Sequence, residues 1–96
     1  GIDFAAVIGT PIYATADGTI DLLQNSFSGY GKMIEIDHGF GYRSRYAHMH
    51  GFAVRQGQRV KRGDLIGYVG DTGISTAPHL HYEVLINGVQ VNPVHY

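Results

Sequence analysis

Along the chain, short runs rich in Ile, Val, Tyr and Thr alternate with Gly, Asp, Asn and Pro. Runs of this length between turn residues are typical of antiparallel strands joined by tight turns. The expected strands are residues 11–15, 19–23, 31–37, 42–48, 65–69, 79–86 and 89–91. No window keeps apolar residues at the i, i+3, i+4 spacing of an amphipathic helix over several turns. The pattern therefore predicts an all-β fold.

Two dipeptides between strand-like runs, Asp17-Gly18 and Asn87-Gly88, have the sequence of two-residue hairpin turns. Such turns need a positive φ at both central residues, which Asn, Asp and Gly adopt most readily. We expect a β-hairpin at each dipeptide.

A chain of 96 residues has room for one domain with one modest core. Its 44% hydrophobic and 16% charged residues are those of an ordinary globular protein. No apolar stretch approaches the roughly 20 residues of a membrane span, and the first residues do not read as a signal peptide. We expect residues 1–96 to form a single domain without a membrane-inserted segment.

The formal net charge of −1 argues against recruitment to nucleic acid by long-range electrostatics. One local cluster of positive charge could contact an acidic substrate, but a solvated turn is the favoured interpretation. Its members are Arg55, Arg59, Lys61 and Arg62.

The chain contains six histidines and no cysteine. Without cysteine there is no thiol nucleophile, thiolate zinc site or disulfide. Four histidines form two His-x-His pairs, His48 with His50 and His79 with His81. On a strand, positions i and i+2 share a face roughly 7 Å apart, so both rings of a pair could reach one zinc ion. Spacing alone does not separate metal ligands from proton-transfer groups or surface histidines.

Residues 70–83, Gly-Asp-Thr-Gly-Ile-Ser-Thr-Ala-Pro-His-Leu-His-Tyr-Glu, resemble the C-terminal signature of the lysostaphin-type peptidases, the M23 or LytM family. The family commonly has Gly where this chain has Ala77. Further segments match in the family's order over practically the whole chain. They are residues 1–4, 9–12, 45–49, 60–67 and 91–93.

This resemblance implies an antiparallel β-sandwich or half-barrel of the LytM type, built on a duplicated hybrid motif. It also implies a zinc ion held by a His-x-x-x-Asp motif and by the second histidine of His-x-His. Carried over by position, Asp3 and His81 are metal ligands, and His48 and His79 are catalytic. The other histidines, His38, His50 and His95, match no functional position of the family, and the substrate-binding residues stay unknown.

The third zinc ligand of the family motif falls four residues before Asp3, upstream of Gly1. Either the parent protein carries that histidine and this sequence lacks the N-terminal edge of the domain, or the site is degenerate. The first interpretation is favoured because Asp3, His48, His79 and His81 are all retained.

The expected function is that of a zinc metalloendopeptidase that hydrolyses peptide bonds in peptidoglycan cross-links or stem peptides. A D,D-endopeptidase of cell-wall remodelling is favoured over an enzyme that cuts glycine bridges. The resemblance further implies the cell envelope, periplasmic or extracellular, and a longer multidomain chain.

Two alternatives remain at this level. One is a metal-free relative that binds or activates a cell-wall amidase. The other is a phosphoryl-carrier domain of the sugar-uptake system, which would explain residues 60–70 but neither Asp3 nor the Pro-His-Leu-His string.

Overall fold

A computed structural model describes residues 2–5, 7–25, 31–70 and 79–91. At residues 2–5, 79, 80, 90 and 91 it describes the backbone only. Within these stretches the chain forms strands and turns, and no helix long and apolar enough to cross a membrane is found there. The predicted all-β class is confirmed for the described residues.

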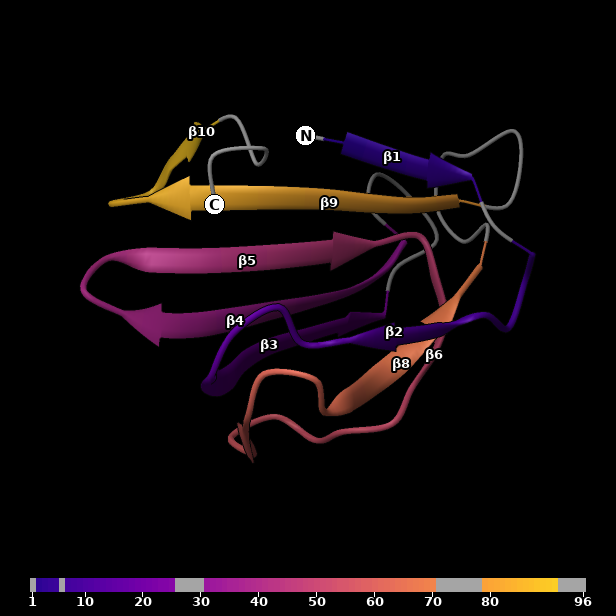
Figure 1. The fold of residues 1–96 in the computed structure, drawn as a ribbon, viewed down its shortest axis with the longest axis horizontal. Coiled ribbons are helices and arrows are strands. Elements are labelled where there is room, and N and C mark those ends of the chain that lie inside the picture. Colours follow the sequence, from indigo (N-terminus) through magenta and orange to yellow (C-terminus); the bar gives the residue numbers. More distant parts are fainter. Residues whose placement is uncertain (1, 6, 26–30, 71–78, 92–96) are drawn as a thin grey trace.

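The strands form two antiparallel sheets (Figure 1). The large sheet has the order β1-β9-β5-β4-β3-β7, with β10 also paired to β9, and the small sheet has the order β2-β8-β6. The large sheet comprises β1 (Ile2–Ala5), β3 (Gly18–Asn25), β4 (Lys32–Gly39), β5 (Tyr42–Ala47), β7 (Arg59–Val60), β9 (His79–Ile86) and β10 (Val89–Val91). The small sheet comprises β2 (Pro11–Tyr13), β6 (Met49–Phe52) and β8 (Leu65–Val69).

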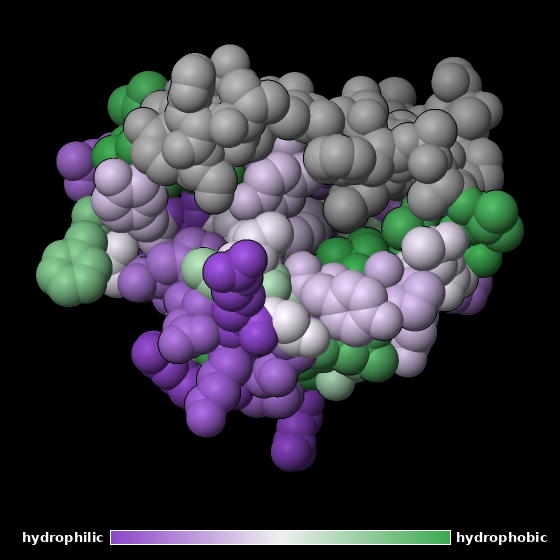
Figure 2. Space-filling model, in the orientation of Figure 1, coloured by the Kyte–Doolittle hydropathy of each residue, from purple (hydrophilic) through white to green (hydrophobic). Residues whose placement is uncertain are grey.

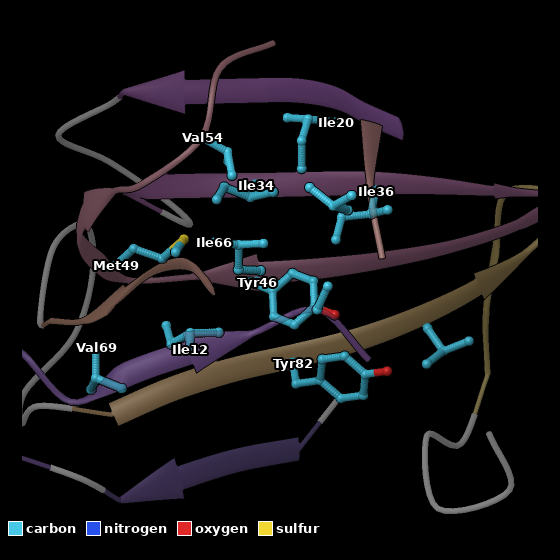
Figure 3. Close-up of a cluster of buried hydrophobic side chains, with 13 residues drawn as sticks. Ile12, Ile20, Ile34, Ile36, Tyr46, Met49, Val54, Ile66, Val69 and Tyr82 are labelled. Atoms are coloured by element: carbon cyan, nitrogen blue, oxygen red, sulfur yellow. The ribbon is translucent and has the colours of Figure 1, made fainter. Parts of the chain in front are cut away.

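One apolar core fills the space between the two sheets (Figure 3). On β4, Ile34 and Ile36 are fully buried, while the intervening Glu35 is on the opposite side of the strand. Alternation of this kind places every second side chain of a strand on the same face. From the small sheet, Ile12 and Ile66 enter the same core. The large sheet therefore has one apolar face against the small sheet and one outer face.

The hairpin predicted at Asn87-Gly88 is confirmed. These two residues have φ values of 51° and 80°, as a tight turn between β9 and β10 requires.

The hairpin predicted at Asp17-Gly18 is wrong, because β2 pairs with β8 while β3 pairs with β4 and β7. The dipeptide serves a different purpose. Asp17 accepts a hydrogen bond from the backbone N–H of Arg62 at 2.8 Å. A Cβ at position 18 would lie only 2.6 Å from the Asp37 carbonyl oxygen, so Gly18 permits close approach of β4.

Every expected strand is present, with ends shifted by up to two residues. The sequence pattern did not predict β1, β6 or β7. The strand β6 has the sequence Met-His-Gly-Phe, which lacks β-branched residues, and β7 is two residues long. Both depend on pairing with distant strands.

Candidate metal and catalytic site

The strand β9 brings the predicted ligands together through its pairing with β1. In that antiparallel register, Asp3 is opposite His81 and Ala5 is opposite His79. Directly opposite residues have Cα atoms about 4.5–5.5 Å apart. The fold therefore places Asp3 and His81 side by side although they come from the two ends of the chain. At Asp3 and His79 the structure describes the backbone only.

His48 follows the end of β5 instead of belonging to it, which corrects the expected strand 42–48. Its backbone has a φ of 58°, in the left-handed region that non-glycine residues seldom adopt. The residue is buried, with 7% exposure, and its ring centroid lies 6.1 Å from that of His81. Loop geometry thus brings the first histidine of one pair to the second histidine of the other.

The two members of the 48/50 pair do not share a face, contrary to the strand-based expectation. His48 is buried and His50 is exposed. The left-handed residue interrupts the alternation that would have placed both rings together.

The strand β9 separates polar from apolar side chains on its two faces. Tyr82 and Val84 are buried in the core, whereas His81 and Glu83 occupy the alternate positions on the outer face. The register places Ala47 of β5 opposite His81.

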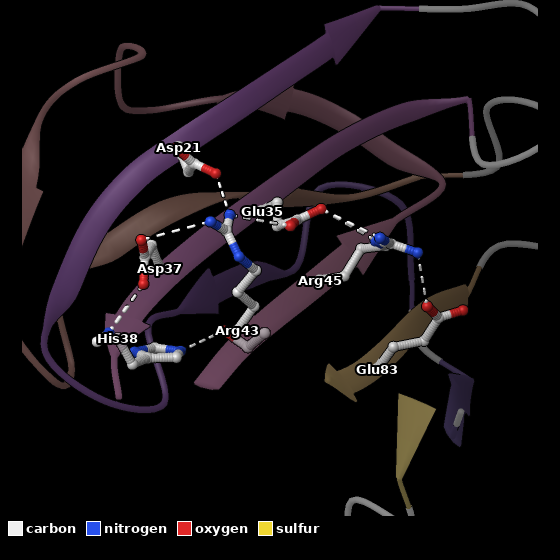
Figure 4. Close-up of polar contacts among 9 residues, drawn as sticks. Asp21, Glu35, Asp37, His38, Arg43, Arg45 and Glu83 are labelled. Atoms are coloured by element: carbon white, nitrogen blue, oxygen red, sulfur yellow. Dashed lines mark hydrogen bonds and ion pairs between the residues drawn. The ribbon is translucent and has the colours of Figure 1, made fainter. Parts of the chain in front are cut away.

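A charged network begins at Glu83, two positions after His81, and crosses the outer face of the large sheet (Figure 4). His81 Nε2 lies 2.7 Å from Glu83 Oε2, and Arg45 donates to Glu83 Oε1 at 3.1 Å. The guanidinium of Arg45 also donates to Glu35 Oε2, at 3.2 and 3.3 Å. Arg43 donates to Glu35 Oε1 at 3.2 Å.

At the far end of this network, Arg43 also pairs with Asp21 and Asp37. Hydrogen bonding to Asp21 is the main cause that raises the pKa of Arg43. The network thus extends from β9 through β5 and β4 to β3 (Figure 4).

Glu83 and Arg45 occur in the matched sequence segments, but no role was expected for either. The signal available in the sequence was the alternation of strand faces, which puts every second residue on the same side. Glu83 occupies the same strand face as His81, two positions on, and the register places Arg45 directly opposite Glu83. That register depends on long-range pairing, which the sequence pattern alone does not give.

The donor chemistry fits zinc. An imidazole and a carboxylate position are paired in register, and the chain offers no thiolate as a competing ligand. Among residues whose side chains are described, no group of three His, Cys, Asp or Glu is arranged to hold a metal ion. The side chains of Asp3 and His79 are outside that set.

A separate pocket of about 350 Å³ opens on the core side of the sheet. It is lined by residues that include His38, Phe40, Tyr42 and Tyr82, and neither His48 nor His81 is among them. Because Tyr82 and His81 point to opposite faces of β9, this pocket is distinct from the predicted site.

The remaining histidines and the basic cluster have simpler surroundings. The ring of His38 bridges the Asp17 carbonyl oxygen and Ser44 Oγ, both at 2.7 Å, so it links the turn before β3 to the strand β5. His95 lies outside the described residues. The four basic residues near β7 are exposed, in agreement with a solvated turn, and Figure 2 shows hydrophilic residues gathered over that region.

Comparison with known proteins gives close sequence relatives. The chain is 51% identical over 94 residues to the DD-carboxypeptidase/endopeptidase Mpg of Neisseria meningitidis serogroup B, covering 98% of this chain and 21% of that protein. It is 45% identical over 92 residues to the peptidoglycan DD-endopeptidase ShyA of Vibrio cholerae, covering 96% and 21%. The chain therefore spans about a fifth of the length of these curated relatives.

Solved structures show the same fold. The catalytic domain of lysostaphin from Staphylococcus simulans matches with a TM-score of 0.92 and 37% identity, covering 99% of this chain and 75% of that one. A zinc containing peptidase from Vibrio cholerae matches with a TM-score of 0.91 and 42% identity, covering 95% and 28%. These matches confirm the expected LytM-type arrangement of two antiparallel sheets.

The sequence pattern of peptidase family M23 matches residues 1–93. The phosphoryl-carrier interpretation is thereby left without support. Given this match and the close relatives, the chain belongs to peptidase family M23.

Proposed function

We propose that this chain is the catalytic unit of a zinc-dependent D,D-endopeptidase that cleaves peptidoglycan cross-links in the cell envelope. The observation that carries the proposal is the pairing of Asp3 with His81 in a fold that also brings His48 beside His81. The relatives Mpg and ShyA, at 51% and 45% identity, are named for D,D-peptidase activity.

Zinc would be held by Asp3, His81 and a histidine four residues before Asp3 in the parent protein. Positions four apart on a strand have the same parity, so β1 continued upstream would present that histidine on the same face as Asp3. Three protein ligands leave a fourth position open, as catalytic zinc sites require.

A zinc ion bound there would supply a Lewis acid and lower the pKa of a coordinated water to about 7. His79, two positions before His81, would accept the proton of the attacking water and pass it to the leaving amine. His48 would donate a hydrogen bond to the oxyanion formed on the scissile carbonyl. A buried donor held in a fixed loop conformation suits that second role, because it need not reorganise as charge develops.

The D,D cross-link is preferred over a glycine bridge as the scissile bond. The relatives Mpg and ShyA, at 51% and 45% identity, are both named for D,D-peptidase activity, and neither name refers to a glycine bridge. A protein that acts on peptidoglycan would work in the cell envelope, on its periplasmic or extracellular side.

The test is hydrolysis of a purified D,D-cross-linked muropeptide dimer by the full-length protein, with a pentaglycine-bridged substrate as the comparison. We expect zinc-dependent release of monomers from the dimer and little cleavage of the glycine bridge. His79→Ala should lower turnover on the order of a hundredfold while retaining zinc. His81→Ala should lose zinc, as measured by metal analysis after gel filtration.

Two results would count against the proposal. Unchanged turnover in His79→Ala would remove its role as base. A wild-type protein that neither binds zinc nor cleaves either substrate would instead fit the metal-free amidase activator.

A further inference from the structure

The buried carboxylate of Glu83 contacts the ring of the predicted zinc ligand His81. Glu83 has only 3% side-chain exposure, and its Oε2 is 2.7 Å from Nε2 of the 21% exposed His81 ring. An ionised carboxylate only accepts hydrogen bonds, so the proton of this contact belongs to Nε2 of the imidazole. A neutral imidazole carries one N–H, and Nδ1 is then the nitrogen with the lone pair that a metal needs.

Glu83 is itself held in place from the other side. Arg45 donates to Glu83 Oε1 at 3.1 Å and supplies the counter-charge in this buried position. The register places Arg45 between Glu83 on β9 and Glu35 on β4. The guanidinium is fixed in turn by Glu35, with 3.2 and 3.3 Å contacts. Each carboxylate oxygen of Glu83 therefore has a defined partner, which restricts its rotamer. Figure 4 shows the contact with Arg45.

We propose that Glu83 is a positioning residue of the metal site, which fixes the tautomer and ring orientation of His81 so that Nδ1 faces the zinc ion. The proposal rests on the role of His81 as a ligand in the proposed function. In this role Glu83 acts through His81, whose Nε2 lies 2.7 Å from Glu83 Oε2. Arg45 holds Glu83 in the required rotamer.

Loss of such a carboxylate partner typically lowers metal affinity about 10- to 100-fold. Glu83→Ala removes the acceptor of the Nε2–H and leaves Arg45 without this partner. Glu83→Gln retains an oxygen acceptor of nearly the same shape but lacks the charge. We therefore expect zinc affinity in the order wild type, Glu83→Gln, Glu83→Ala, with the conservative variant partly restoring what alanine loses.

The matched control is Glu35→Gln. Glu35 is a buried carboxylate of the same network, with 9% exposure, and it contacts Arg45 but not His81. The amide oxygen of the glutamine can still accept from Arg45, so Arg45 stays against Glu83. Glu35→Gln should therefore lower the midpoint of thermal unfolding to an extent comparable with Glu83→Gln, while zinc affinity stays within about threefold of wild type. This comparison separates a general structural effect from an effect on the ligand.

Two measurements on the full-length protein test the proposal. The first is the zinc dissociation constant of each variant, obtained by competition with a chromogenic chelator. The second is the tautomer of His81 in zinc-free protein, read from histidine-selective ¹⁵N chemical shifts at a pH where the ring is neutral. We expect protonation at Nε2 in wild type and in Glu83→Gln, and a mixture of both tautomers in Glu83→Ala.

A Glu83→Ala protein with wild-type zinc affinity and an unchanged His81 tautomer would overturn the positioning role. So would a fall in zinc affinity that Glu35→Gln reproduces in full. His81→Ala distinguishes the two proposals. If it retains zinc at wild-type affinity, the proposed ligand set fails; if it loses zinc while Glu83→Ala does not, only the role of Glu83 fails.

Discussion

At Tyr46 a phenol hydroxyl is buried in the core, with 1% residue exposure, among other hydroxyl groups. Its oxygen lies 2.9 Å from Thr15 Oγ1 and accepts from Ser44 Oγ at 3.2 Å. Burial is the main cause that raises the pKa of Tyr46 above its ordinary value. The folded state therefore favours the neutral phenol more strongly than the unfolded chain does.

This difference predicts a loss of stability in alkali that Tyr46→Phe should reduce. Above the unfolded pKa of about 10, the unfolded chain releases a proton that the folded protein retains, so the free energy of unfolding falls as pH rises. Phenylalanine has no such proton. Urea unfolding at about pH 8 and about pH 11 should show the advantage of wild type over Tyr46→Phe shrinking with pH. A constant difference would show that Tyr46 ionises equally in both states.

The residue types of the candidate site were predictable, but their conformations were not. The His-x-His spacing and the family resemblance pointed to His48, His79, His81 and Asp3. The left-handed backbone of His48, which separates it from His50, depends on how the chain passes from β5 to β6. No local propensity of histidine indicates that conformation.

At the scale of elements, strands with clear alternation were predicted and those made by long-range pairing were not. The strand β4 alternates Ile34 and Ile36 with polar residues, which specifies its inner face from sequence alone. The turn at Asp17-Gly18 has the same local chemistry as the one at Asn87-Gly88. Only the latter joins paired strands, because the partner of β2 is β8, far along the chain.

Two glycines on the paired strands β6 and β8 should respond very differently to the same substitution. A Cβ at Gly67 would lie 2.5 Å from the Gly51 carbonyl oxygen and would collide with Met49 Cε, whereas a Cβ at Gly51 meets nothing within 4 Å. Gly67→Ala should therefore cost about 1–3 kcal/mol through overpacking. Gly51→Ala should stay within about 0.5 kcal/mol of wild type. Denaturant unfolding measures both, and equal costs would contradict the close approach of the two strands at Gly67.

On the scale of the whole molecule, the apolar core and the candidate site lie on opposite faces of the large sheet. The inner face packs on the small sheet through one core, and the outer face carries His81 and the carboxylate–arginine network. Tyr82 belongs to the core and follows His81 directly on β9. The position of the candidate site therefore depends on packing between the two sheets, which the sequence alone did not reveal.

If the two sheets share one core, a cavity in the small sheet should destabilise the large sheet equally. Ile66 of β8 is fully buried in the shared core, while the neighbouring Leu65 is 37% exposed. Ile66→Ala should cost about 2–5 kcal/mol, and Leu65→Ala, with its side chain partly in solvent, distinctly less. Amide hydrogen exchange should show the same loss of protection in β4 as in β8, because both are exposed in one cooperative unfolding event. Retained protection in β4 alone would mean that the two sheets open separately, and that the large sheet, which carries the candidate site, does not require the small sheet for its stability.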